Sequence, residues 1–178
     1  IMHTRNLFIA ICLSTFIVNL DFTILNIIAV DITTSLHYSL NFADKIITYY
    51  ALSFAITLLI AGKLGDINRY TTIVYGVILF SLSSIMCALS SNFFLLIVGR
   101  VLQGSASALI FTNASATIPD IFNQEREQMR AISIFSSSMG TSLAIGPIIG
   151  YYISSMYSWR MVFWINIPIA ALILYLIR

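Results

Sequence analysis

A carboxylate, Asp21, lies near the middle of an apolar run that extends from Leu7 to Val30. This run is long enough to cross a bilayer as one helix. An ionised carboxylate near the centre of such a helix costs about 2.5–3.5 kcal/mol on insertion scales. Carboxylates are therefore kept inside membranes mainly where they face a watery cavity or a partner helix, and many of them bind protons or cations. Asp21 is the first candidate for chemistry.

A second charge, Arg100, lies in another apolar run, and Gln103, Gly104 and Ser107 follow it at helical spacing on the same face. At a rise of about 1.5 Å per residue, Asp21 and Arg100 both come to lie roughly 20 Å from the same membrane surface. An ion pair or a shared water network is therefore geometrically allowed. A guanidinium favours the ionised carboxylate, whereas desolvation favours the neutral one, and this competition suits a proton site. The alternative is a static ion pair that joins two helices.

Polar side chains occur on two sides of the run from Leu7 to Val30. One group falls within a sector about 60° wide, and Asp21 lies on roughly the opposite face. A helix that faced lipid on one side would not be polar on both, so we expect this helix inside the bundle. The candidates for lining a cavity are Asn19, Thr23, Asn26 and, on the other run, Ser107. Alternatively, these side chains only hydrogen-bond to neighbouring helices.

Two glycine-containing stretches are further candidates. The first contains Gly62, Gly65, Asp66 and Arg69. Its two glycines permit a tight turn, and Asp66 can interact with a helix N-terminus or a basic partner. The alternative is an ordinary solvated loop. The second stretch consists of Gly140, Gly146, Pro147 and Gly150. Three of its members, Gly140, Pro147 and Gly150, share a stripe of small residues, which favours either close helix packing or a pivot.

The composition indicates which elements must position these residues. The chain is 59% hydrophobic and 9% charged, whereas soluble domains carry about 25% charged residues. At about 20 residues per span, 178 residues accommodate six transmembrane helices. The apolar runs cover residues 7–30, 46–64, 72–90, 93–118, 131–152 and 161–177. We predict an all-α, multi-pass integral membrane protein, with residues 1–178 forming a single six-helix bundle.

The basic residues in the short loops predict the orientation. With a cytoplasmic N-terminus, six of them lie inside and two outside, which favours both termini in the cytoplasm. The inner residues are Arg5, Lys63, Arg69, Arg126, Arg130 and Arg178, and the outer ones are Lys45 and Arg160.

Several functions have no support in the sequence. There is no phosphate-binding loop of the G-x-x-x-x-G-K type, no Cys/His spacing typical of a metal site, and no recognisable nucleophile–base set. No basic stripe suggests nucleic acid as a partner. We therefore expect that the protein is not an enzyme and that it has no metal or organic cofactor. We expect the lipid bilayer to be its first partner.

Five motifs together resemble the major facilitator superfamily, most closely its fourteen-span drug:proton antiporters. They are Leu20–Asn26, Gly62–Asp66, Arg100–Gly104, Gly146–Gly150 and Trp159–Pro168. They occur in the family's order and cover nearly the whole chain. The resemblance implies the N-terminal six-helix half of a longer transporter, which requires a C-terminal helical half as a partner.

The resemblance also implies roles. Asp21, Arg100 and Gln103 would couple protons to substrate, the stretch from Gly62 to Arg69 would gate, and the stretch from Gly140 to Gly150 would pivot. The expected function is proton-coupled efflux of small-molecule drugs by alternating access, driven by the proton gradient across the cell (inner or plasma) membrane. One alternative is a transporter of a metabolite, sugar or siderophore. Another is a truncated, non-transporting membrane protein or assembly partner.

Overall fold

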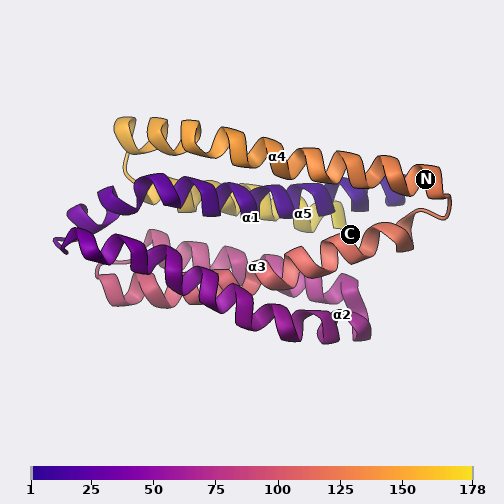
Figure 1. The fold of residues 1–178 in the computed structure, drawn as a ribbon, viewed down its shortest axis with the longest axis horizontal. Helices are drawn as coiled ribbons and strands as arrows, with labels where there is room; N and C mark the ends of the chain where they lie inside the picture. The colour runs from indigo at the N-terminus through magenta and orange to yellow at the C-terminus, as the bar shows by residue number, and fades with distance from the viewer. Residues whose placement is uncertain (1, 178) are drawn as a thin grey trace.

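The computed structural model describes residues 2–177, and this part of the chain is helical throughout except for short connections (Figure 1). The elements are α1 Met2–Ser35, η1 Leu40–Phe42, α2 Ala43–Ala88, α3 Phe93–Ile121, α4 Glu125–Met156 and α5 Arg160–Ile177. All five α-helices are long and apolar enough to cross a membrane. The all-α prediction is confirmed for the described residues.

Helix α1 is longer than its apolar run, because it continues past Val30 to Ser35. The Thr33 hydroxyl donates to carbonyls one turn back, so this polar residue is accommodated within the helix. The helix ends at Ser35, and two residues later His37 has a left-handed φ of 61°. The Tyr38 amide then donates to the Thr33 carbonyl over 2.9 Å. This arrangement satisfies the last carbonyls of α1 in the manner of a Schellman cap.

Helix α2 contains a reversal of direction at Asn68, where the backbone is non-helical (φ −161°, ψ 99°). Before the reversal, Tyr50 donates to Ser107 of α3 over 2.7 Å. After the reversal, Ser84 accepts a hydrogen bond of 2.9 Å from Gln103 of α3. Because Gln103 and Ser107 lie one turn apart, both segments of α2 reach the same level of α3. Figure 1 shows α2 crossing the molecule and returning.

The prediction of a glycine turn in this region is wrong. Gly62 and Gly65 are both helical, and the turn follows at Asn68. The Asn68 side-chain oxygen accepts from the Thr71 amide over 3.0 Å, so Asn68 acts as the N-cap of the returning segment. Gly65 has a packing role instead, because a Cβ atom there would overlap Asn113 of α3.

Helix α1 contacts each of the other four α-helices, which confirms the prediction that it lies inside the bundle. Small residues allow α2 and α3 to approach closely. A Cβ atom on Gly99 would lie 2.5 Å from the Cys87 sulfur, and one on Gly104 would overlap Ser53. This tight packing holds the polar face of α3 against α2.

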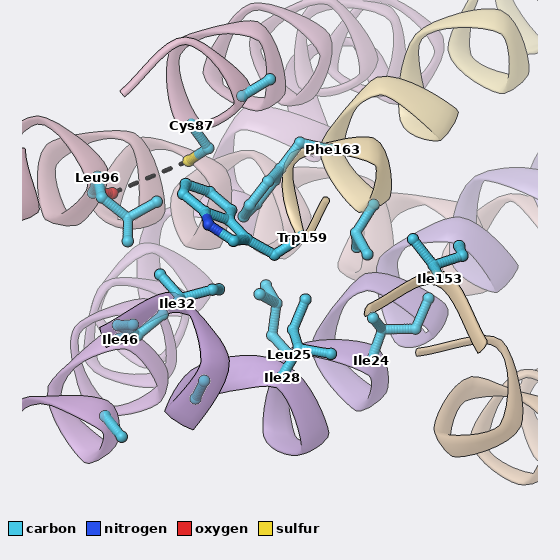
Figure 2. Close-up of a cluster of buried hydrophobic side chains, with 14 of the residues drawn as sticks. Ile24, Leu25, Ile28, Ile32, Ile46, Cys87, Leu96, Ile153, Trp159 and Phe163 are labelled. Carbon is cyan, nitrogen blue, oxygen red and sulfur yellow. Dashed lines mark hydrogen bonds between the residues drawn. The ribbon is translucent and has the colours of Figure 1, made fainter. Parts of the chain in front are cut away.

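A hydrophobic cluster joins the helices beyond the polar centre of the bundle. Figure 2 shows Trp159 and Phe163 near its middle, surrounded by aliphatic side chains from α1 to α4. The two rings meet edge to face, with centroids 6.1 Å apart. The Trp159 indole nitrogen donates to the Ser35 hydroxyl over 2.7 Å, so its single polar group is satisfied at the edge of the cluster.

Polar contacts hold the helix ends together at both ends of the molecule. At one end, Arg69 pairs with Asp120 and Tyr70 donates to the Ile177 carbonyl over 2.7 Å. At the other end, Arg160 donates to the Ser90 carbonyl over 2.8 Å and Ser154 donates to Asp31.

Candidate functional site

The centre of the bundle contains an ion pair between Asp21 of α1 and Arg100 of α3. The Arg100 Nη1 atom lies 2.7 Å from Asp21 Oδ2, and both side chains are 0% exposed. The two charges therefore meet at one level, as the depth estimate allows. Each charge lies in an apolar helix, and burying either one alone would be strongly unfavourable.

Two amide side chains complete the coordination of Asp21. Gln103 Nε2 and Asn166 Nδ2 donate to Asp21 Oδ1 over 3.0 and 2.9 Å. Arg100 Nη1 also donates to Gln103 Oε1 over 2.5 Å. The Ser84 hydroxyl oxygen accepts from both amides, over 2.9 and 3.1 Å. Side chains from α1, α2, α3 and α5 thus form one polar network inside an apolar bundle.

The hydrogen bonds around Asp21 depend on its carboxylate being an acceptor at both oxygens. Both carboxylate oxygens accept hydrogen bonds from donors. A protonated carboxyl group would present a donor to one of these donors, so at least one contact would have to break or reverse. The Gln103 amide is held in one orientation, because its oxygen accepts from Arg100 while its nitrogen donates to Asp21 and Ser84. A proton on Asp21 would therefore disturb the junction of four helices.

Sequence reasoning missed three members of this site. Asn166 lies in the stretch Trp159–Pro168 that carries the family resemblance, so a signal was available. Ser84 and Tyr50 have no distinguishing local pattern, because serine and tyrosine are common in apolar helices. Only the reversal of α2 brings them to the level of Arg100.

Tyr50 covers the network on one side. Its ring centroid lies 4.1 Å from the Arg100 guanidinium carbon, and its hydroxyl is bound to Ser107. Ser107 donates in turn to the Gln103 carbonyl over 2.7 Å. Ser107 is fully buried and is not among the residues that line the cavity beside Tyr50. It supports the tyrosine from behind.

An apolar cavity of about 310 Å³ lies next to Tyr50, which forms part of its wall. Its lining residues are Val18, Asn19, Phe22, Tyr50, Ala51, Phe54, Phe111 and Met139. The Phe22 and Tyr50 rings lie 5.7 Å apart. A space of this size suits part or all of a small ligand.

Asn19 alone among the predicted cavity residues lines this space in the described part of the chain. Thr23 donates to the Asn19 carbonyl over 2.6 Å and packs beneath Gly146 of α4. Asn26 is exposed, and its amide donates to the Phe22 carbonyl over 2.8 Å. Both Thr23 and Asn26 therefore bond within α1, because one turn of helix places a carbonyl within their reach.

The stretch from Gly62 to Arg69 lies at one end of the bundle, far along α2 from the ion pair. Asp66 is exposed. Arg69 turns away from it, pairing with Asp120 and donating to the Ala116 carbonyl of α3 over 3.1 Å. The arginine thus joins the reversal of α2 to the end of α3.

The glycines of α4 separate into two groups. Cβ atoms on Gly146 and Gly150 would lie 2.7 and 3.1 Å from atoms of Thr23 and Ile24, so both glycines bring α4 close to α1. Gly140 meets no neighbour within 4 Å. The predicted stripe is therefore not one packing face. The buried face of α4 contains Gly146 and Gly150, whereas Gly140 is exposed and Pro147 is partly buried.

Among the described residues, no group of His, Cys, Asp or Glu could hold a metal ion. Two relatives of this chain are named as resistance proteins. The methylenomycin A resistance protein of Bacillus subtilis is 30% identical over 92% of this chain and 35% of its own length. The tetracenomycin C resistance and export protein of Streptomyces glaucescens is 37% identical over 90% of this chain and 30% of its own length. The chain thus spans about a third of these relatives.

The fold has a counterpart among solved structures. A crystal structure of the peptide transporter POT superposes with a TM-score of 0.82 and 18% identity, over 96% of this chain and 36% of that one. The family model described as Major Facilitator Superfamily matches residues 11–178. Apolar helices and this match make the protein an integral membrane protein of a transporter family rather than an enzyme. The chain belongs to the major facilitator superfamily.

Proposed function

We propose that this chain is the N-terminal half of a proton-coupled exporter of small-molecule drugs. The observation that carries the proposal is the buried network around Asp21 and Arg100 beside an apolar cavity. The names of two relatives, a methylenomycin A resistance protein and a tetracenomycin C resistance and export protein, support the direction of transport and the class of substrate.

The membrane topology is part of the proposal. We take the two segments of α2 as separate spans, because the chain reverses at Asn68. This gives six spans in one domain, with both termini cytoplasmic. The distribution of basic residues supports this orientation, because Arg5, Arg69 and Arg126 lie at the end opposite Lys45 and Arg160. The membrane would be the cell (inner or plasma) membrane.

In the proposed mechanism, the proton gradient supplies the energy and no other cofactor takes part. Asp21 releases a proton on one side of the membrane and takes one up on the other. The contacts that Arg100 and Gln103 make with Asp21 change as its charge changes. Breaking a contact of the network changes the packing of the helices, so proton binding favours one of two access states. The substrate lies in the cavity bounded by Tyr50, and a C-terminal half provides the opposite wall.

The residues at the reversal of α2 and the small residues of α4 would take part in the same alternation between access states. Asp66 and Arg69, with Gly62 and Gly65, would form a gate at the cytoplasmic reversal of α2. Gly146, Pro147 and Gly150 would let α4 shift against α1, because small residues and proline allow close packing and bending. Gly140 would face the C-terminal half.

Transport by the full-length protein in proteoliposomes tests the role of Asp21. With Asp21→Asn, we expect efflux driven by a pH gradient to fall to the level of empty vesicles. Substrate exchange without a gradient should persist, because the cavity is intact. Asp31→Asn is the matched control, since Asp31 lies on the same helix but is exposed. Gradient-driven efflux by Asp21→Asn at the wild-type rate would overturn the proposed coupling.

A further inference from the structure

We propose that the Tyr50 ring is a movable cover, behind which the free N–H groups of Arg100 bind a carbonyl oxygen of an uncharged, planar, mainly apolar ligand. This inference rests on the proposed transport function and specifies the substrate class of the same cavity.

The first observation is an incomplete set of partners around Arg100. A guanidinium has five N–H donors. The two on Nη1 reach Asp21 and Gln103. The donors on Nε and Nη2 are buried and contact no acceptor among the described residues. Buried donors without acceptors are unfavourable, so this side of Arg100 is suited to an oxygen supplied by a ligand.

The second observation is the position of Tyr50. Its ring lies 4.1 Å from the guanidinium carbon and also forms part of the wall of the 310 Å³ cavity. A ring face attracts a cation, but it is a weaker partner for N–H donors than a carbonyl oxygen. Tyr50 therefore separates the unpartnered donors from the space in which a ligand would lie.

The third observation is how the Tyr50 side chain is held. Tyr50 is buried, a single hydrogen bond joins its hydroxyl to Ser107, and the Phe22 ring lies tilted against its ring at 5.7 Å. The ring also borders the cavity, which offers a space into which it can turn. A ligand that offers an oxygen to Arg100 can replace the cation–π contact with stronger hydrogen bonds.

The charges and the walls specify the ligand. Asp21 lies 2.7 Å from the guanidinium and compensates its charge, so an anion has no net attraction to this pair while Asp21 is ionised. An uncharged carbonyl oxygen fits. The cavity walls carry the aromatic rings of Phe22, Phe54 and Phe111, which favour a planar, apolar body.

Equilibrium binding to the full-length protein in lipid nanodiscs tests the inference. One probe is Nile red, which is uncharged and planar and whose emission moves to longer wavelength when its carbonyl accepts a hydrogen bond. The other is N-phenyl-1-naphthylamine, which is uncharged and aromatic but has no carbonyl. Tyr50→Phe removes only the bond to Ser107. We expect this variant to bind Nile red about two- to tenfold more tightly, which is the effect of one hydrogen bond, with longer-wavelength emission. Binding of the naphthylamine should change less than twofold.

Two further variants support the interpretation. Ser107→Ala removes the same hydrogen bond from the other side and should reproduce the selective gain. Phe54→Leu alters the same cavity at a ring that packs against Phe111 at 6.1 Å, and should weaken both probes alike. Equal gains for both probes in Tyr50→Phe would mean that the ring only limits volume, and no gain for either would mean that it does not move. Either result overturns the inference. Because no gradient is used, the outcome is independent of the Asp21→Asn transport assay.

Discussion

Asp21 accepts hydrogen bonds from side chains of two helices, α3 and α5. The contacts that Asp21 would keep depend on which of these donors is removed. Without Arg100, a buried carboxylate would have no counter-charge. Without Asn166, the ion pair and the contact to Gln103 remain, and only one donor to Oδ1 is lost. Asn166 is therefore the residue at which the contribution of the network can be measured without destroying it.

We expect Asn166→Leu to lower the free energy of unfolding by about 1–3 kcal/mol, because Asp21 Oδ1 loses a donor inside the bundle. Unfolding by a denaturing detergent, followed by circular dichroism, provides the measurement. Asn26→Leu is the control, since the Asn26 amide bonds only to a carbonyl of its own helix and is exposed. A change within about 0.5 kcal/mol is expected there. Equal losses in the two variants would contradict a stabilising role for Asn166 in the network.

At this scale, the sequence predicts the charged core of the site and little else. Asp21 and Arg100 stand out because a charge in an apolar run has few acceptable surroundings, and helical rise alone gives their depth. Tyr50 and Ser84 do not stand out, because their importance depends on which segments face each other. Asn19 lines the cavity beside Tyr50, whereas Ser107 accepts a hydrogen bond from the Tyr50 hydroxyl and does not line that cavity.

Among the elements, α2 and α3 are held together by small residues at defined positions. Gly65 and Gly62 lie on the same helix three residues apart, yet their surroundings are opposite. A Cβ atom on Gly65 would overlap the Asn113 side chain, whereas one on Gly62 meets no atom within 4 Å. Asn113 is itself fixed by a 3.2 Å hydrogen bond to the Ala61 carbonyl and a 2.8 Å bond to the Leu109 carbonyl.

We therefore expect Gly65→Ala to destabilise the protein by about 1–3 kcal/mol, because Asn113 must move and lose a bond. Gly62→Ala should be neutral or stabilising by up to about 1 kcal/mol, because alanine is the better helix former. Thermal unfolding in detergent micelles compares the two. The double variant Gly65→Ala, Asn113→Ala should recover part of the loss. Similar losses at Gly62 and Gly65 would indicate a general intolerance of this helix rather than close packing.

The helices themselves were predictable because long apolar runs leave few alternatives in a membrane protein. The residues at which the helices end are harder to predict from the sequence. The run ending at Val30 continues to Ser35 because threonine hydroxyls bond to the preceding turn. The turn in α2 was assigned to glycines, but it depends on Asn68 as an N-cap. Glycine indicates both turns and close packing, and sequence alone does not separate these two uses.

In the whole molecule, the helices are not equally attached. The polar network joins α1, α2, α3 and α5, whereas α4 packs mainly on α1, with Gly146 and Gly150 at the contact. Helix α4 also exposes Ser133, Ser137, Gly140 and Thr141 on one side. A polar, small-residue surface is unfavourable against lipid tails, so this side is suited to face protein or a watery cavity.

Cysteine labelling of the full-length protein in intact cells tests the arrangement of the whole chain in the membrane. Cys12 and Cys87 are first replaced by alanine, since the former is only partly buried. A membrane-impermeant maleimide should then label Lys45→Cys from outside. Lys63→Cys and Arg126→Cys should be labelled only after permeabilisation, because the reversal of α2 at Asn68 lies at the end of the bundle where α4 begins, with Arg69 paired to Asp120 at the end of α3. Lys63→Cys is the decisive position. If it were labelled from outside like Lys45→Cys, the two segments of α2 would not be separate spans, and both the six-span count and the cytoplasmic gate would have to be abandoned.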